Sequence, residues 1–292
     1  MWTRLARLPF IWRLLVKWIL LLFVILFALY PHPGLLFKHV QHLRNIESLI
    51  QPDLPEIAVI NHELDAHLNP NGSRKDEFRA VERYVNQRIP YQFDWFNWGN
   101  LDYWPTTQEV LERNTEDCDG RAVLAASILQ ARGFKTARIV GNIDHVWVTV
   151  DGAELMSPQP DKNYTHAGAK ARVSLPQLRT WLRAASKICK FPAVRSLLIL
   201  AAVLVLAYHP CRNVTGLLAA AVVLLIAFAL MVDWASRFNS RDPHPISLQL
   251  VISFMLALGS VIFALCADRF LARNPAVPAG SGQPREQNRT PD

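Results

Sequence analysis

The segment EDCDGRAVLAASILQARG, residues 116–133, predicts a helix that begins at about Cys118. Acidic residues in its first turn suit a helix N-terminus, where the macrodipole leaves partial positive charge. Apolar residues follow at helical spacing, and Gly133 is a typical helix stop. A thiol at a helix start is favoured as thiolate, which is the nucleophilic form of cysteine.

A strand follows the helix. In HVWVTVDG, residues 145–152, three valines alternate with His145, Trp147 and Thr149, so the histidine should lie on the face opposite the core. Asp151-Gly152 is a hairpin signal, residues 153–156 should form the returning strand, and residues 136–140 are a further β-prone run. A neighbouring imidazole could take the proton of the Cys118 thiol.

Spacing alone leaves two interpretations of this cysteine and histidine open. The first is a catalytic pair. The second is a structural role, because most cysteines and most histidines on strands only pack against their neighbours. Asp117 and Asp119 argue against deep apolar burial of Cys118, but carboxylates beside a thiol raise its pKa. A disulfide between Cys118 and Cys189 would exclude catalysis, although no cysteine framework requires one.

Several short motifs occur together and in order along the chain. They read YWPTTQEVL at 103–111, DCDGRA at 117–122, GF at 133–134 and HVWV at 145–148. This combination resembles the transglutaminase-like superfamily, most closely the bacterial transglutaminase-like cysteine proteinases. Residues 81–91 are similar to the helix and short tail that lead into such domains. The resemblance covers about residues 75–158, and its motifs are moderately specific.

The resemblance implies an α+β, papain-like soluble domain with a cysteine helix packed on an antiparallel sheet. It implies a cysteine peptidase or amidase with Cys118 as nucleophile and His145 as base. The family usually carries an aspartate before proline on the returning strand, where this chain has Ser157. Asp161, four residues on, is therefore the candidate third member. Serine can orient an imidazole but cannot offset its positive charge, so the alternative is a catalytically impaired module that binds a peptide or envelope partner.

Asp117 and Asp119 are candidate calcium ligands. Some periplasmic members of the family that the chain resembles bind calcium through acidic residues flanking the cysteine. Calcium prefers oxygen ligands, and its charge would reverse the penalty that the carboxylates impose on a thiolate. Two acids are too few for a complete site, and acids at a helix start commonly interact only with the dipole. Apart from calcium, no cofactor is expected.

Aromatic residues gather between residues 91 and 104, just before the cysteine helix. They could line an extended substrate groove or form a packed loop over the fold. The cluster comprises Tyr91, Phe93, Trp95, Phe96, Trp98 and Tyr103.

Long apolar segments predict a multi-pass membrane protein. Residues 14–30, 214–232 and 246–267 are each long enough to cross a hydrocarbon core. Residues 196–208 form a shorter apolar stretch, so whether it spans stays open. No small-residue cleavage site follows the first segment, which predicts a retained anchor. The apolar segments carry almost no ionisable residues, which argues against a transport pathway.

Charge predicts how the chain lies in the membrane. Basic residues near both termini predict cytoplasmic ends in a bacterial cell membrane, with the soluble domain facing the periplasm or exterior. The net charge of +7 reflects these flanks. No aromatic–basic pattern predicts nucleic-acid binding. We expect an anchor (1–31), a leader segment (32–74), the transglutaminase-like domain (75–170), a juxtamembrane helix (171–192), two to three transmembrane helices within 193–267 (about 193–209, 214–232 and 246–267), and a disordered basic tail (268–292).

Overall fold

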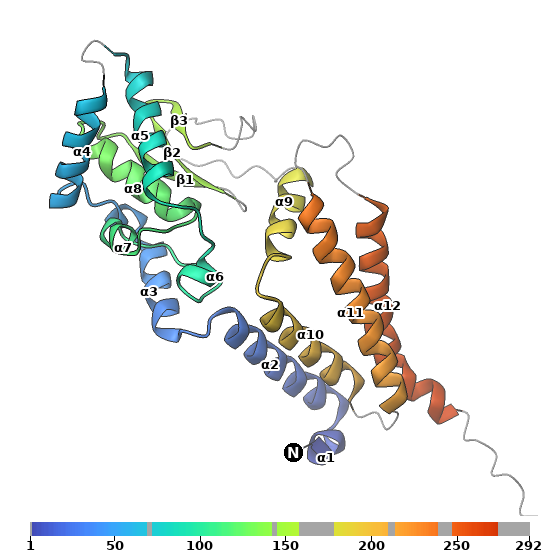
Figure 1. The fold of residues 1–292 in the computed structure, drawn as a ribbon. Helices are drawn as coiled ribbons and strands as arrows, with labels where there is room; N and C mark the ends of the chain where they lie inside the picture. Colours follow the sequence, from blue (N-terminus) through green and yellow to red (C-terminus); the bar gives the residue numbers. More distant parts are fainter. Residues whose placement is uncertain are drawn as a thin grey trace, which may run out of the picture.

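A computed structural model describes residues 2–68, 72–141, 145–157, 178–209, 214–238 and 247–273. In these parts the chain is mostly helical, with one three-stranded antiparallel sheet (Figure 1). Asp161, the predicted third catalytic residue, and the tail from residue 274 onward lie outside the described residues.

The domain that contains the sheet (the sheet domain) is built around α8 (Cys118–Ala131), which begins at Cys118 as the sequence predicts. Apolar residues surround this helix on all sides, as in a helix buried in a core. Leu124 and Ile128 are fully buried, and burial of each such side chain contributes about 1.5–3 kcal/mol. The helix contacts α4 (Pro55–His67), α5 (Arg74–Arg88), α7 (Thr107–Arg113) and strand β2 (Val146–Val150).

The expected leader segment contributes to this domain. It forms α3 (Pro33–Arg44), the short 3-10 helix η1 (Ile46–Leu49) and α4. Ile57, Ile60 and Leu64 on α4 belong to the same hydrophobic core as α8. The core therefore begins well before residue 75.

The sheet has the order β1-β2-β3, with β1 at Arg138–Gly141 and β3 at Ala153–Leu155. Asp151 and Gly152 join β2 to β3 with φ angles of 47° and 83°. Positive φ at both central residues defines the hairpin turn whose twist matches the strands. The valines of β2 are buried as predicted, but Trp147, expected on the opposite face, is buried too.

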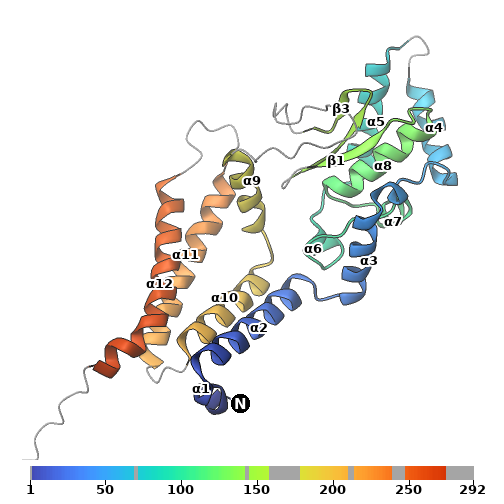
Figure 2. The ribbon, with the colours of Figure 1, turned by 180° about the vertical axis from the view of Figure 1, so that it is seen from behind.

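Two helices, α2 (Phe10–Leu29) and α11 (Val214–Arg237), are long and apolar enough to cross a membrane. α12 (Leu248–Arg273) packs along α11, and α10 (Ala193–Tyr208) packs along α2 (Figure 2). A 98° bend separates α10 from α9 (Leu178–Ile188), which contacts α11. These helices support membrane association, while the number of spans and the orientation stay predictions. The N-terminal helix α1 spans Trp2–Arg7.

The sheet domain contacts the ends of α2 and α10 through the loop that contains α6 (Asp94–Asn97). The Leu101 backbone N–H donates to the Leu29 carbonyl at 2.8 Å, at the end of α2. Arg195, near the start of α10, donates from Nη1 to the Gly99 carbonyl at 2.6 Å. The loop is therefore held by both helix ends, and α6 lies between the sheet and these helices in both views (Figures 1 and 2).

Candidate active site

Cys118 and His145 line one open pocket of about 190 Å³. The cysteine comes from the start of α8, and the histidine immediately precedes β2. The sequence motifs that predicted a pair are thus brought to one place by the contact between α8 and β2. The complete lining consists of Glu82, Asn86, Tyr91, Cys118, Arg121, His145, Val146, Met156 and Ser157.

The thiol itself is held in its neutral form. Burial, followed by the nearby Asp117 carboxylate, raises the pKa of Cys118 to about 12. Lys187 on α9 and a hydrogen bond from the Val146 backbone N–H act in the opposite direction on this pKa. The helix start is therefore outweighed by desolvation and by like charge, and the thiol stays protonated at neutral pH.

The imidazole of His145 is oriented by the main chain. Its Nε2 lies 2.7 Å from the carbonyl oxygen of Met156, so Nε2 donates to this acceptor and Nδ1 is the basic nitrogen of the ring. Met156 has a φ of 57°, in the left-handed region that side chains rarely adopt. Among the described residues, a backbone carbonyl makes the contact to the imidazole that the sequence predicted for Asp161 or Ser157.

Substitution of Ser157 by alanine should leave the reactivity of Cys118 unchanged. The serine lines the pocket, but the Met156 carbonyl and not its hydroxyl holds the imidazole. The measurement is the rate at which iodoacetamide labels Cys118 in Ser157→Ala against the unaltered chain. A large decrease in this rate would mean that the hydroxyl orients the ring.

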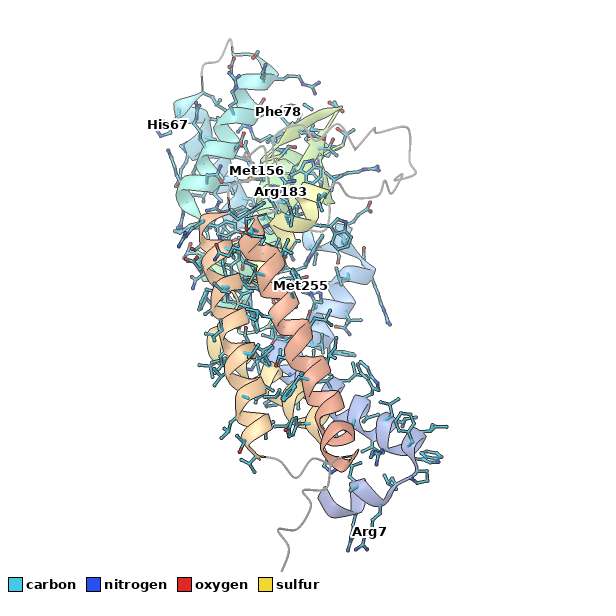
Figure 3. All side chains as sticks on the ribbon, turned by 90° about the vertical axis from the view of Figure 1, so that its right-hand side faces the viewer. Arg7, His67, Phe78, Met156, Arg183 and Met255 are labelled. Carbon is cyan, nitrogen blue, oxygen red and sulfur yellow. The ribbon has the colours of Figure 1, made fainter. Side chains whose placement is uncertain are left out.

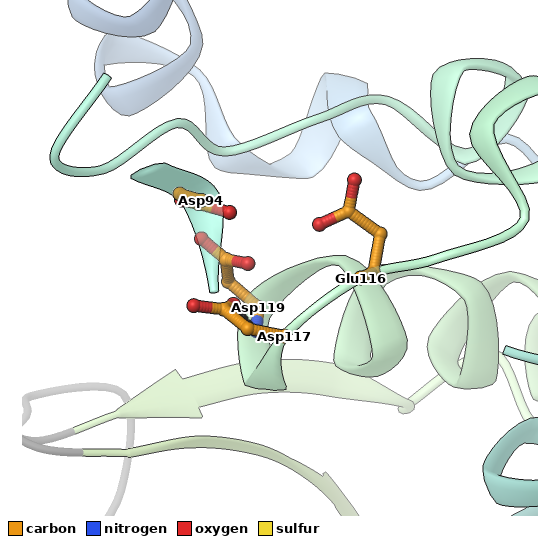
Figure 4. A group of neighbouring side chains, drawn as sticks. All are labelled: Asp94, Glu116, Asp117 and Asp119. Carbon is orange, nitrogen blue, oxygen red and sulfur yellow. Dashed lines mark hydrogen bonds between the residues drawn. The ribbon is translucent and has the colours of Figure 1, made fainter. Parts of the chain in front are cut away.

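Four carboxylates cluster beside Cys118 (Figure 4). One oxygen from each of Asp94, Glu116, Asp117 and Asp119 lies within 4.8 Å of the others. Asp94, Glu116 and Asp119 are buried, with Asp94 only 1% exposed. The cluster includes both acids that the sequence singled out and adds Asp94 and Glu116, which it did not.

Two buried oxygens in this cluster, one on Asp94 and one on Glu116, have no hydrogen-bond partner among the described residues. Asp94 accepts the Tyr103 backbone N–H at 2.6 Å on Oδ2, and Glu116 accepts the Trp98 indole N–H at 2.8 Å on Oε1. Asp94 Oδ1 and Glu116 Oε2 make no hydrogen bond within the described part of the chain. A buried acceptor without a partner is costly, and a bound cation is one way to satisfy it.

The buried carboxylates of this cluster repel one another, so they must either bind protons or be neutralised by a cation. Burial, followed by the charge of Asp117, raises the pKa of Asp119 well above its usual value, and the same two causes do so for Asp94. Burial also raises the pKa of Glu116 to about 8. An all-oxygen donor set of this kind fits calcium better than it fits softer metals.

Some aromatic residues between residues 91 and 104 pack over the fold and others are exposed beside the pocket, so both roles that the sequence left open occur. Trp95 and Trp98 are buried and pack under the loop, whereas Phe96 is 62% exposed and Tyr91 is 45% exposed. Tyr91 also lines the pocket, under the guanidinium of Arg121, which lies 5.2 Å from its ring centroid. The segment is both a cover for the fold and one wall of the site.

No protein-family model matches the chain, and neither the curated proteins nor the solved structures include one with significant similarity to it. The likeness to the transglutaminase-like superfamily therefore rests on the sequence motifs alone.

Proposed function

We propose that the chain is a membrane-anchored, transglutaminase-like cysteine hydrolase that acts on amide or peptide bonds outside the cytoplasm. The observation that supports this most is the shared pocket, in which Cys118 and an oriented His145 lie together. The packing of the cysteine helix against an antiparallel strand is compatible with the papain-like fold that the motifs imply.

In the proposed reaction, His145 Nδ1 takes the proton from the Cys118 sulfur as the sulfur attacks the amide carbonyl. The backbone N–H at the start of α8 is a candidate donor to the oxyanion. The tetrahedral intermediate collapses to a thioester as the imidazolium gives its proton to the departing amine. Water, deprotonated by the same imidazole, then hydrolyses the thioester and restores the thiol. The Met156 carbonyl stabilises the imidazolium less than a carboxylate would, which predicts a modest rate.

We also propose that the carboxylate cluster of Asp94, Glu116, Asp117 and Asp119 holds a calcium ion. The two buried oxygens without partners and the all-oxygen donor set support this assignment. When bound, calcium supplies positive charge that offsets the carboxylates beside Cys118 and so favours the thiolate.

Thiol labelling tests the proposed pair. In a chain whose other three cysteines are serine, Cys118 should react with iodoacetamide in calcium about tenfold faster at pH 7 than a free cysteine does. His145→Ala should remove this advantage, because the base that takes the proton is lost. Cys118→Ala should abolish both labelling and any amide hydrolysis. A wild-type labelling rate no higher than that of free cysteine would contradict the activated pair.

A catalytically impaired module that binds a peptide is the second candidate. The raised pKa of Cys118 favours it, because a thiol that stays neutral is a poor nucleophile. The labelling rate measured against pH in calcium separates the two candidates. An enzyme should show an apparent pKa well below that of free cysteine, whereas a binding module should show one above it.

A further inference from the structure

The pocket is linked to the membrane helices by an unbroken row of aromatic rings. Tyr91 at the pocket wall contacts Phe93, with ring centroids 5.4 Å apart. Phe93 stacks on Trp95 at 4.3 Å, and Trp95 meets Phe191 edge-on at 5.6 Å. Phe191 lies in the turn between α9 and α10. The wall of the pocket is thus three ring contacts from the start of α10.

The loop that contains α6 and carries these rings is also hydrogen-bonded at its C-terminal end. Its distance from the ends of α2 and α10 is therefore fixed. Besides the bonds of Gly99 and Leu101, Asn100 exchanges two hydrogen bonds with the backbone of His32, at 3.1 and 3.2 Å. Asn100 is fully buried. Direct packing replaces the flexible linker that would let a soluble domain drift away from a bilayer.

These contacts fix which side of the domain faces the bilayer. If α2 and α10 end at the membrane surface, the pocket wall at Tyr91 lies three ring contacts from that surface. His67 and Phe78 lie at the end remote from Arg7 (Figure 3). A compact domain of about 130 residues has a radius of gyration of roughly 14 Å, so its far side is more than about 30 Å away.

We propose that this pocket takes the membrane-proximal stem of polypeptides anchored in the same bilayer. The inference rests on the proposed function and adds the substrate class. A stem leaving the bilayer meets the pocket within its first few residues, beside the exposed rings of Tyr91 and Phe96. A soluble chain has no such advantage, because anchoring raises the effective concentration at a site within reach of the tether.

Lipid-tethered probes measure how close Cys118 lies to the bilayer. The full chain, with Cys118 as its only cysteine, is placed in nanodiscs with calcium. Phosphatidylethanolamine carries a Gly/Ser tether of 6 or 40 residues that ends in an iodoacetyl group. The short tether reaches at most about 21 Å, and the long one spans roughly 35 Å on average. The short probe should label Cys118 roughly tenfold faster, since effective concentration falls steeply with tether length.

A matched cysteine at the far end of the domain serves as control. Lys75→Cys in a Cys118→Ser background places an exposed thiol near the start of α5, remote from α2 and α10 (Figure 1). There the long probe should label faster. Faster labelling of Cys118 by the long probe than by the short one, on a lipid anchor and on a transmembrane helical anchor alike, would overturn the proposal.

Two further arms separate the possible failures. Free iodoacetamide tests the activated pair alone. If it labels Cys118 slowly while the short probe still labels faster than the long one, the proposed function is refuted and the position of the pocket near the bilayer is supported. The same tethers carried on a transmembrane helical peptide distinguish helix-anchored from lipid-anchored stems. A short-tether advantage on either anchor supports the proposal, and its absence on both overturns it.

Discussion

Calcium is expected to raise the melting temperature of the sheet domain, by an amount that grows as the pH rises from 5 to 8. Burial raises the pKa of Glu116 to about 8, and the pKa values of Asp94 and Asp119 are raised as well. Between the ordinary carboxyl pKa and these raised values, the folded state holds protons that the unfolded state has released. Stability in chelator therefore falls as the pH rises through this window.

Calcium should remove this loss, because a cation replaces the protons. At one hundred times its dissociation constant, a ligand stabilises the folded state by about 2.7 kcal/mol, which corresponds to several degrees in melting temperature. The measurement is a melting curve, followed by tryptophan fluorescence, in calcium and in chelator at pH 5, 6, 7 and 8.

Asp94→Asn is the matched variant for this experiment. The amide keeps the size of the side chain but removes one charge, so the calcium effect should shrink while stability in chelator at pH 8 should rise. Identical melting curves with and without calcium at every pH would rule out the cation site.

Gly120→Ala is expected to destabilise the domain by about 1–3 kcal/mol, the usual cost of overpacking a core. A Cβ at residue 120 would lie 2.6 Å from Cγ of Glu116. That side chain can move aside only at a cost, because it is fully buried and hydrogen-bonded by Asn97 and Trp98. Helix propensity alone predicts the opposite sign, since alanine normally stabilises a helix relative to glycine.

Gly34→Ala on α3 is the control, because nothing lies within 4 Å of its added Cβ. It should melt at or slightly above the temperature of the unaltered chain. The same melting experiment should show a reduced calcium effect in Gly120→Ala, since Glu116 is displaced from the cluster. A Gly120→Ala chain that melts as high as the unaltered one would show that Glu116 is not held in place.

Local patterns predicted the parts of the site that depend on neighbouring residues. The helix start at Cys118 and the Asp151-Gly152 turn follow from first-turn acids and from a residue pair suited to positive φ. Asp94 could not be paired with Asp117 in the same way, because the folding of the α6 loop over α8 brings the two together. Glu116 adjoins Asp117 in the sequence, but adjacency alone does not show that both side chains enter one cluster. The partner of His145 could not be predicted for a different reason. It is a backbone carbonyl, which every residue type has, so no residue pattern marks it.

The apolar alternation of β2 predicted the buried valines but not the burial of Trp147. A period of two assumes that one face of a strand is covered and the other is open. In this sheet both faces of β2 are enclosed at Trp147, and an alternating pattern cannot signal that enclosure.

The hydrogen bond from His145 to the Met156 carbonyl has a consequence for genetics. Alanine scanning of the pocket would leave this acceptor intact at every position, so a screen of the proposed hydrolase would not reveal this contact through any side chain. Exchange of the peptide bond after Met156 for an ester, which weakens the carbonyl as an acceptor, would reveal its contribution where codon changes cannot.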